Sequence, residues 1–340
     1  MIDAIRRFTY HRQRLGRAAP DAPTALRDVV GVYSSHPSAP LSLYARAAAF
    51  DFKAVDGLRL PAMRGSIHLL PRDTAHLAFR GLELPPATEA SRMKYFKLTP
   101  ERYAELREKT LAVAAEPRTA AELRKLVGAG DEMRYVLAAM GREGLLVRVG
   151  AEGLRSNALR WARAEIPGAD PDEALAWLAG EYLRAFGPAR REDFAWWAGV
   201  QPKRAQAALA TVDTVELDGG LLLRRADEAE LDRAPKLPRD AVDLLPKWDA
   251  LTMGYPRDGR GRFAHEDVLD RCYDFRGDGN PLVLRGGEAV AAWTLRFAGK
   301  RMEVELDWFE RPGAKLAKAV AGKVEDVGAL LGASSVTGHD

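Results

Sequence analysis

The chain has 340 residues, 47% of them hydrophobic, with 51 basic residues against 48 acidic ones. This length exceeds what one hydrophobic core usually organises, so the sequence predicts two or three folded domains and excludes a disordered chain. The absence of a long apolar run and of an apolar N-terminal segment argues against a membrane span and a signal peptide, and favours a cytoplasmic protein. The single cysteine, Cys272, excludes an intramolecular disulfide and a cysteine-rich zinc site.

Arginine is unevenly distributed, although basic and acidic residues nearly balance. A predicted N-terminal helix carries one cluster and a glycine-rich loop, YPRDGRGRF, carries a second. The members are Arg6, Arg7, Arg12, Arg14 and Arg17 in the helix and Arg257, Arg260 and Arg262 in the loop. Such clusters suit phosphates, so we expect Arg12, Arg14 and the three loop arginines to be exposed and to contact nucleic acid. The alternative is a solvated helix face and a solvated loop tip.

A polar group interrupts two apolar, helix-prone runs near the N-terminus, in the stretch GVYSSHPSAPLSLY. Its members are Tyr33, Ser34, Ser35 and His36, and a proline-marked turn follows them. One interpretation is that Ser35 and Ser38 cap the helix around Leu41 by bonding its free amides. The other interpretation is a functional site. If the segment is extended, Tyr33 and Ser35 share one face and His36 points to the other.

The segment RGSIHLLP predicts an apolar strand, followed by a helix over residues 72–79. Arg64, at its start, is expected to reach a phosphate. His68, within the strand, is either a core histidine or a side chain that faces nucleic acid. Residues 1–97 are predicted to form a degenerate, winged-helix-like domain that holds the polar group.

Two middle segments repeat one order of predicted elements, in which three helices precede a β-hairpin. In residues 98–165, Thr119 and Glu122 form a capping box, Asp131 can cap a later helix, and LLVRVGAEGLRSNALRW alternates like two strands. In residues 166–236, three helical stretches precede the hairpin TVELDGGLLL. Both segments are therefore predicted to be winged helices.

In a winged helix the third helix enters the major groove of DNA and the hairpin contacts the backbone. Arg134, Lys203 and Arg204 therefore become candidate DNA contacts. The alternative is that both units bind protein or are structural. The two tryptophans of FAWWA, Trp196 and Trp197, are expected to pack in the core.

From about Leu244 the hydrophobic period becomes that of strands. PLVLRGGEAVAAWTLRFAGKRMEVELDWF predicts three strands, and GAKLAKAVAGKVEDVGALL predicts a closing helix. The predicted fold class is therefore α+β, mostly α, with tandem winged-helix domains and a small β-barrel-like domain at residues 237–340.

Several segments together resemble the winged-helix DNA glycosylases of the AlkZ and YcaQ type, which excise bulky alkylated bases and unhook interstrand crosslinks. The segments are RRFTYHRQRL, RGSIHLLPRD, YLRAFGPARREDFAWWAGV, LLPKWDALTMGYPRD and PLVLRGGEAVAAW. The resemblance implies a concave, positively lined surface for duplex DNA. Lys247, in the fourth segment, is a further expected DNA contact. Asp249, two residues later, is expected to orient an arginine such as Arg257 or to cap a turn.

The family carries Gln-x-Gln or Gln-x-Asp after a Gly-Val pair that corresponds to Gly31 and Val32, and those side chains resemble a water-positioning pair. Here Tyr33 and Ser35 stand at the matching positions. We expect their hydroxyls to hold the attacking water and His36 to take its proton. A strong acid is dispensable, because an N7-alkylated purine carries positive charge and leaves readily.

The sequence therefore predicts a DNA-repair glycosylase for bulky N7-substituted purines in duplex DNA. We expect a monomer in the cytoplasm, associated with the nucleoid, that needs no metal, no organic cofactor and no membrane. Two alternatives stay open. One is a non-catalytic winged-helix protein that senses or shields DNA damage, and the other is a transcription regulator, which normally needs a dimerisation element and an effector pocket.

Overall fold

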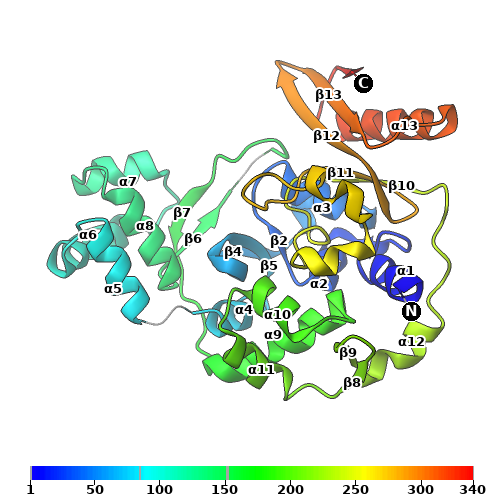
Figure 1. Cartoon of the computed structure of the whole chain (residues 1–340). Helices are drawn as coiled ribbons and strands as arrows, with labels where there is room; N and C mark the ends of the chain where they lie inside the picture. Colours follow the sequence, from blue (N-terminus) through cyan, green and yellow to red (C-terminus); the bar gives the residue numbers. More distant parts are fainter. Residues whose placement is uncertain (1, 84–85, 151–152, 340) are drawn as a thin grey trace.

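The computed structural model describes residues 2–83, 86–150 and 153–339 (Figure 1). In Figure 1 the helices of residues 86–142 lie on one side of a mixed central body, and the C-terminal sheet lies above it. Within the described residues, no helix has the length and apolar character needed to cross a membrane.

The N-terminal third combines short helices with strands. The helices are α1 (Ile2–Arg12), α2 (Ala22–Asp28), α3 (Ser38–Tyr44) and α4 (Ala75–Gly81), with 3-10 turns η1 (Phe52–Ala54) and η2 (Met63–Gly65). The strands are β1 (Ala19–Asp21), β2 (Val32–Tyr33), β3 (Ala47–Ala49), β4 (Gly57–Pro61) and β5 (Ile67–Pro71). β1 pairs in parallel with β3, whereas β5 lies antiparallel between β2 and β4.

The first helical unit precedes a hairpin, as predicted. Its elements are α6 (Pro100–Val113), α7 (Ala120–Val127), α8 (Met133–Arg142), β6 (Leu146–Val149) and β7 (Arg160–Arg163), and a further helix, α5 (Pro86–Tyr95), precedes it. The predicted capping box opens α7, because the Thr119 hydroxyl accepts from the Glu122 amide and the Glu122 carboxylate accepts from the Thr119 amide. The expected Asp131 cap is wrong, since α8 starts after Glu132 and has no side-chain cap.

The second unit has the same order of elements. They are α9 (Pro171–Phe186), α10 (Arg191–Ala198), α11 (Pro202–Leu209), β8 (Thr214–Leu217) and β9 (Leu221–Arg224), followed by η3 (Arg225–Asp227) and α12 (Glu228–Asp232). In each unit the second hairpin strand also forms a single bridge with the link before the second helix, Trp161 with Arg118 and Leu222 with Ala189. The role of these units as DNA-binding winged helices remains a prediction.

The hairpin of the first unit extends the N-terminal sheet. Arg148 of β6 pairs with Arg59 of β4, which gives five antiparallel strands in the order β2-β5-β4-β6-β7. The helices of this unit have a core of their own, which includes Leu106 and Val136. The unit therefore packs its helices by itself but shares a sheet with the N-terminal third.

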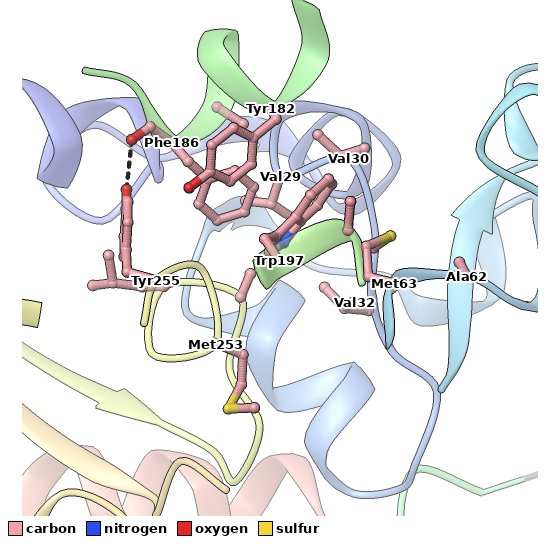
Figure 2. Packing of buried hydrophobic residues seen from close by; sticks show 14 of the residues in the cluster. Val29, Val30, Val32, Ala62, Met63, Tyr182, Phe186, Trp197, Met253 and Tyr255 are labelled. Carbon is pink, nitrogen blue, oxygen red and sulfur yellow. Dashed lines mark hydrogen bonds between the residues drawn. The ribbon is translucent and has the colours of Figure 1, made fainter. Parts of the chain in front are cut away.

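The largest core joins three segments that the sequence assigned to separate domains. Figure 2 shows part of this core, with Val29 from the N-terminal third, Tyr182, Phe186 and Trp197 of the second unit, and Tyr255 of the C-terminal part. The Tyr255 hydroxyl donates to the Phe186 carbonyl at 2.6 Å. Elements from all three segments are thus held at fixed positions around one core.

The C-terminal part is an open sheet with one covering helix. Its strands are β10 (Val242–Leu245), β11 (Leu282–Arg285), β12 (Glu288–Ala298), β13 (Arg301–Trp308) and β14 (Ser335–His339), with η4 (Arg257–Arg262) and η5 (Glu266–Arg271) between β10 and β11. The predicted helix is confirmed as α13 (Ala314–Leu330), which buries Val320, Val324 and Val327 against the sheet. The barrel-like expectation is wrong. In the described chain β10 and β14 are opposite edges, and α13 already covers the apolar face.

Candidate active site

A cavity of about 590 Å³ opens where the N-terminal sheet, α10 and two C-terminal loops meet. Its lining residues are Tyr33, Ser34, Ser35, Arg64, Gly65, Ser66, Ile67, Arg148, Trp196, Trp248, Met253, Arg276, Gly277 and Asp278. Segments that are more than 200 residues apart in the sequence thus meet in one place.

The edge strand β2 presents the polar group to this cavity. Tyr33 pairs with His68 of β5, and the Ser34 amide continues the pairing by donating to the Ile67 carbonyl at 3.0 Å. Tyr33 and Ser35 both line the cavity, and so does Ser34 between them. The strand β2 ends at Tyr33, so the strict alternation of an extended backbone does not continue to Ser35 and His36.

The polar group does not cap α3 through its side chains. Pro37 is the N-cap residue, and no side-chain cap hydrogen bond is present. Backbone carbonyls serve instead, because the Ala39 amide donates to Ser35 at 2.7 Å and the Leu41 amide donates to Pro37 at 3.0 Å. The helix-cap interpretation of Ser35 and Ser38 is therefore wrong. Within the described residues the Ser35 hydroxyl forms no hydrogen bond, which leaves it available to a ligand.

His36 lies on the opposite face and does not line the cavity. Its amide donates to Asn157 Oδ1 at 2.6 Å, and its Nδ1 lies 3.2 Å from the Leu154 carbonyl oxygen. Burial, and to a smaller extent the charge of Arg59, lowers the pKa of His36. The imidazole thus ties the polar segment to the loop before β7, and the structure does not bring it to the two hydroxyls.

Arg64 links two walls of the cavity. Its guanidinium lies 4.0 Å from the centroid of the Trp196 ring and donates a hydrogen bond to the Tyr33 hydroxyl. The Arg64 backbone is left-handed, with φ of 53° and ψ of 27°, which is costly for a residue other than glycine and persists where the surrounding structure holds it. Gly199 packs behind it, where a Cβ would lie 2.8 Å from the Arg64 Cα. Among the predicted DNA contacts, Arg64 alone lines this cavity.

Trp248 is a second left-handed residue in the wall, with φ of 58°. Its ring stacks on that of Tyr33, with centroids 6.1 Å apart and planes inclined by 20°. The next residue, Asp249, is fully buried and accepts two hydrogen bonds from the Arg46 guanidinium, both at 2.7 Å. Asp249 therefore orients an arginine, as predicted, but its partner is Arg46 and not Arg257. This ion pair fixes the backbone beside Trp248.

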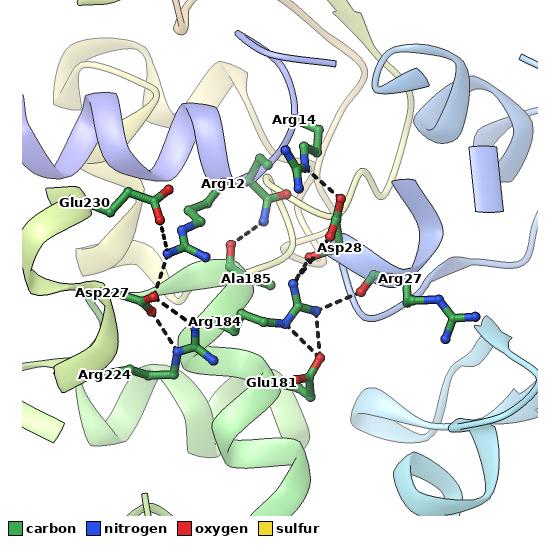
Figure 3. Close-up of polar contacts among 11 residues, drawn as sticks. Arg12, Arg14, Arg27, Asp28, Glu181, Arg184, Ala185, Arg224, Asp227 and Glu230 are labelled. Carbon is green, nitrogen blue, oxygen red and sulfur yellow. Dashed lines mark hydrogen bonds and ion pairs between the residues drawn. The ribbon is translucent and has the colours of Figure 1, made fainter. Parts of the chain in front are cut away.

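Arg12, the last residue of α1, and Arg14, two residues after it, hold the fold together. Figure 3 shows that Arg12 donates to Asp227 and Glu230, both at 2.6 Å, and that Arg14 donates to Asp28 at 2.7 Å. These acids come from α2 and from the segment after β9, so each pair crosses between elements. Arg12 and Arg14 are thus already paired with acidic side chains, and their contact with DNA stays a prediction.

The loop RDGRGRF is not a solvated tip. Arg260 and Arg262 expose only 8% and 7% of their surface. The Arg260 guanidinium lies 3.4 Å from the Tyr273 ring centroid, and Arg262 donates to backbone carbonyls that follow α9. Only Arg257 is exposed, and it pairs with Asp270 at 2.7 Å. The expectation of three exposed arginines is wrong, because η4 packs its second and third arginines against the central body.

His68 is a core histidine, and the expectation that it faces DNA is wrong. Its ring lies directly behind Tyr33, with centroids 4.4 Å apart, and its Nδ1 lies 3.0 Å from the Ser66 carbonyl oxygen. Burial lowers the pKa of His68 to about 4. The neutral imidazole therefore supports the Tyr33 ring from within the sheet.

The remaining predicted contacts lie outside the cavity. Arg134 and Lys203 are exposed near the starts of α8 and α11, the helices that the winged-helix prediction directs to DNA. Arg204 and Lys247 each reach an acidic side chain, at 3.5 and 3.4 Å respectively. Two of these four side chains are thus placed for contact with a large partner.

Sequence reasoning missed several residues of the cavity. Trp196 was expected in the core but is half-buried and lines the wall, and Arg148, Arg276 and Asp278 were not singled out. The last two belong to the loop FRGDGN between η5 and β11. Its glycines mark an irregular segment, where binding residues often gather, and this was the available signal.

The cavity combines cationic, aromatic and hydroxyl groups. Three guanidinium groups suit phosphates, and the faces of two tryptophans suit flat bases or sugars. Within the described residues no three His, Cys, Asp or Glu side chains gather as metal ligands. The arginines, tryptophans and hydroxyls of the cavity therefore suit a ligand that carries both phosphate groups and aromatic rings.

Comparison with known proteins agrees with this chemistry. A family model described as DNA glycosylase AlkZ-like matches residues 26–330. The solved structure of Streptomyces sahachiroi DNA glycosylase AlkZ is similar in fold, with a TM-score of 0.75 and 20% sequence identity over 99% of this chain and 98% of that chain. No curated protein matches the sequence significantly. The class is thus that of DNA glycosylases, repair hydrolases that act on N-glycosyl bonds. This chain belongs to the AlkZ-like DNA glycosylase family.

Proposed function

We propose that this protein hydrolyses the N-glycosidic bond of bulky, N7-substituted purines in duplex DNA. The observation that carries the proposal is the cavity in which the hydroxyls of Tyr33 and Ser35 lie beside three arginines. Membership of the family supports the reaction class.

Binding is assigned to the arginines and tryptophans of the cavity. Arg64, Arg148 and Arg276 contact the phosphates that flank the lesion, since guanidinium groups bind phosphate through paired N–H donors. Trp196 and Trp248 offer ring faces to a base or a sugar. The exposed arginine and lysine at the starts of α8 and α11 extend the contact along the duplex.

The hydroxyls of Tyr33 and Ser35 are assigned the role of holding the attacking water. The C1′–N9 bond breaks with its electron pair on N9, which neutralises the charge that N7 substitution placed on the purine. The oxygen of water then bonds to C1′ and loses a proton, which passes to solvent. The Tyr33 hydroxyl accepts from Arg64 and keeps its own proton to donate to the water, while the unbonded Ser35 hydroxyl accepts from the water. His36 is left out of this step because its ring faces away.

The test is excision from a duplex that carries a single N7-methylguanine. After incubation and alkali treatment, strand cleavage at the lesion reports the abasic product. The wild type is expected to give cleavage, and a variant with Tyr33→Phe and Ser35→Ala is expected to lose it while its DNA affinity holds. Tyr95→Phe, at a side chain that is exposed and outside the cavity, is the matched control. Binding without cleavage by the wild type contradicts the proposal.

One observation favours a second candidate, a non-catalytic protein that senses or shields damage. Neither glutamine nor aspartate stands at positions 33 and 35. Such a protein binds the lesion duplex more tightly than an undamaged duplex and leaves the N-glycosidic bond intact, so the same experiment separates the two candidates.

A further inference from the structure

Asp278 is the one carboxylate among the described residues that line the cavity. It ends a tight turn that begins at Asp274. The Asp274 carboxylate accepts from the amides of Arg276 at 2.9 Å and Asp278 at 3.0 Å, and the Asp274 amide donates to the Asp278 carbonyl at 2.9 Å. Gly277 supplies the left-handed residue of the turn, with φ of 81°.

This turn fixes the backbone of Asp278 without using its side chain. Within the described residues the Asp278 carboxylate forms no hydrogen bond and no ion pair, although three arginines line the same cavity. The neighbouring acids are paired, Asp274 with Lys247 at 3.4 Å and Asp249 with Arg46. Asp278 thus lines the cavity from a backbone that the turn fixes, and its carboxylate is left without a partner among the described residues and available to a ligand.

The proposed reaction needs such a group. As the C1′–N9 bond breaks, positive charge develops on the sugar, and the attacking water must release a proton. The hydroxyls of Tyr33 and Ser35 are neutral and hold water without removing its proton, and His36 faces away from the cavity. The arginines disfavour positive charge on the sugar, so a negative group has to offset them.

We propose that Asp278 is the catalytic carboxylate of this protein, an assignment that rests on the proposed function. One carboxylate oxygen faces the sugar while it is cationic. As the water oxygen bonds to C1′, its proton passes to the carboxylate and from there to solvent. The purine leaves with the electron pair of the broken bond, so charge and atoms balance.

The decisive experiment compares Asp278→Asn with the wild type on the N7-methylguanine duplex. Single-turnover excision is measured at saturating protein, and DNA affinity is measured by fluorescence anisotropy. Excision is expected to fall by about 10² to 10⁴-fold, the usual effect of losing a general base. DNA affinity is expected to rise by a few fold, because a negative charge no longer faces the phosphates. A purely structural residue does not move the two quantities in opposite directions.

Two further variants complete the design. Asp278→Glu keeps the carboxylate and is expected to recover part of the rate. Asp267→Asn removes a carboxylate on η5 that is 84% exposed and outside the cavity, and is expected to change neither quantity. Melting curves are expected to match, because the turn is held by the Asp274 side chain and by backbone groups.

The outcomes separate this inference from the proposed function. An active wild type with an equally active Asp278→Asn variant overturns the role of Asp278 alone. Parallel losses of excision, DNA affinity and melting temperature also overturn it, since they indicate a structural residue. An inactive wild type overturns the proposed function, and the assignment of Asp278 falls with it.

Discussion

Replacing Arg262 with alanine is expected to lower the free energy of unfolding by about 2.5 to 8 kcal/mol. Arg262 donates to the carbonyls of Gly259 at 2.8 Å, Pro188 at 3.0 Å and Phe186 at 3.3 Å. Phe186 keeps the hydroxyl of Tyr255 as a donor, so two buried carbonyls lose theirs, at about 1 to 3 kcal/mol each. The guanidinium also lies 3.8 Å from the Tyr255 ring centroid, a contact that contributes about 0.5 to 2 kcal/mol.

Arg257→Ala is the matched control in the same loop. The Arg257 side chain is 55% exposed and its partner, Asp270, is 85% exposed, so this surface pair contributes less than about 1 kcal/mol. Guanidinium denaturation followed by tryptophan fluorescence measures both variants against the wild type. Equal denaturation midpoints for the Arg262 and Arg257 variants would refute the structural role of Arg262 and would indicate that the loop is solvent-exposed.

Four further outcomes are expected. Asp249→Asn leaves the buried Arg46 guanidinium without its charge partner and should cost about 3 to 5 kcal/mol on denaturation, whereas a loss below about 1 kcal/mol contradicts the pair. His68 has a pKa of about 4 when folded and about 6.5 when unfolded. The unfolded chain therefore binds more protons as the pH falls, and stability should drop by about 3 kcal/mol from pH 6.5 to pH 4. His68→Gln should remove this component of a pH series of unfolding curves, and an unchanged pH dependence contradicts the buried, neutral imidazole. Tyr33→Phe and Ser35→Ala should each lower excision at least about tenfold at unchanged DNA affinity, and full activity of both single variants would move the water site elsewhere. DNA affinity should fall steeply with salt, with a logarithmic slope of about −5 for about six phosphates, whereas a flat slope contradicts phosphate contact.

Local chemistry in the sequence was sufficient for many elements. The capping box of Thr119 and Glu122 opens α7, and the alternating strands around DGG form the hairpin β8–β9. The polar group was also found from the sequence, and Tyr33 and Ser35 line the cavity whereas His36 does not. Such features depend on residues a few positions apart, whose hydrogen bonds and side-chain directions follow from the backbone conformation alone.

Which charged side chains are buried or paired depends on segments that are distant in the sequence. The arginines of RDGRGRF look alike in the sequence, yet η4 buries Arg260 and Arg262 and leaves Arg257 in solvent. The Arg46–Asp249 pair joins residues 203 positions apart.

The sequence by itself determined the order of the helices and hairpins, the family resemblance and the place of the polar group in the chain. Only the tertiary structure decided which arginines remain free, that the C-terminal sheet stays open, and that Asp278 lies in the same cavity as Tyr33. Burial and ion pairing depend on which remote elements share a core, and no short-range pattern contains that information.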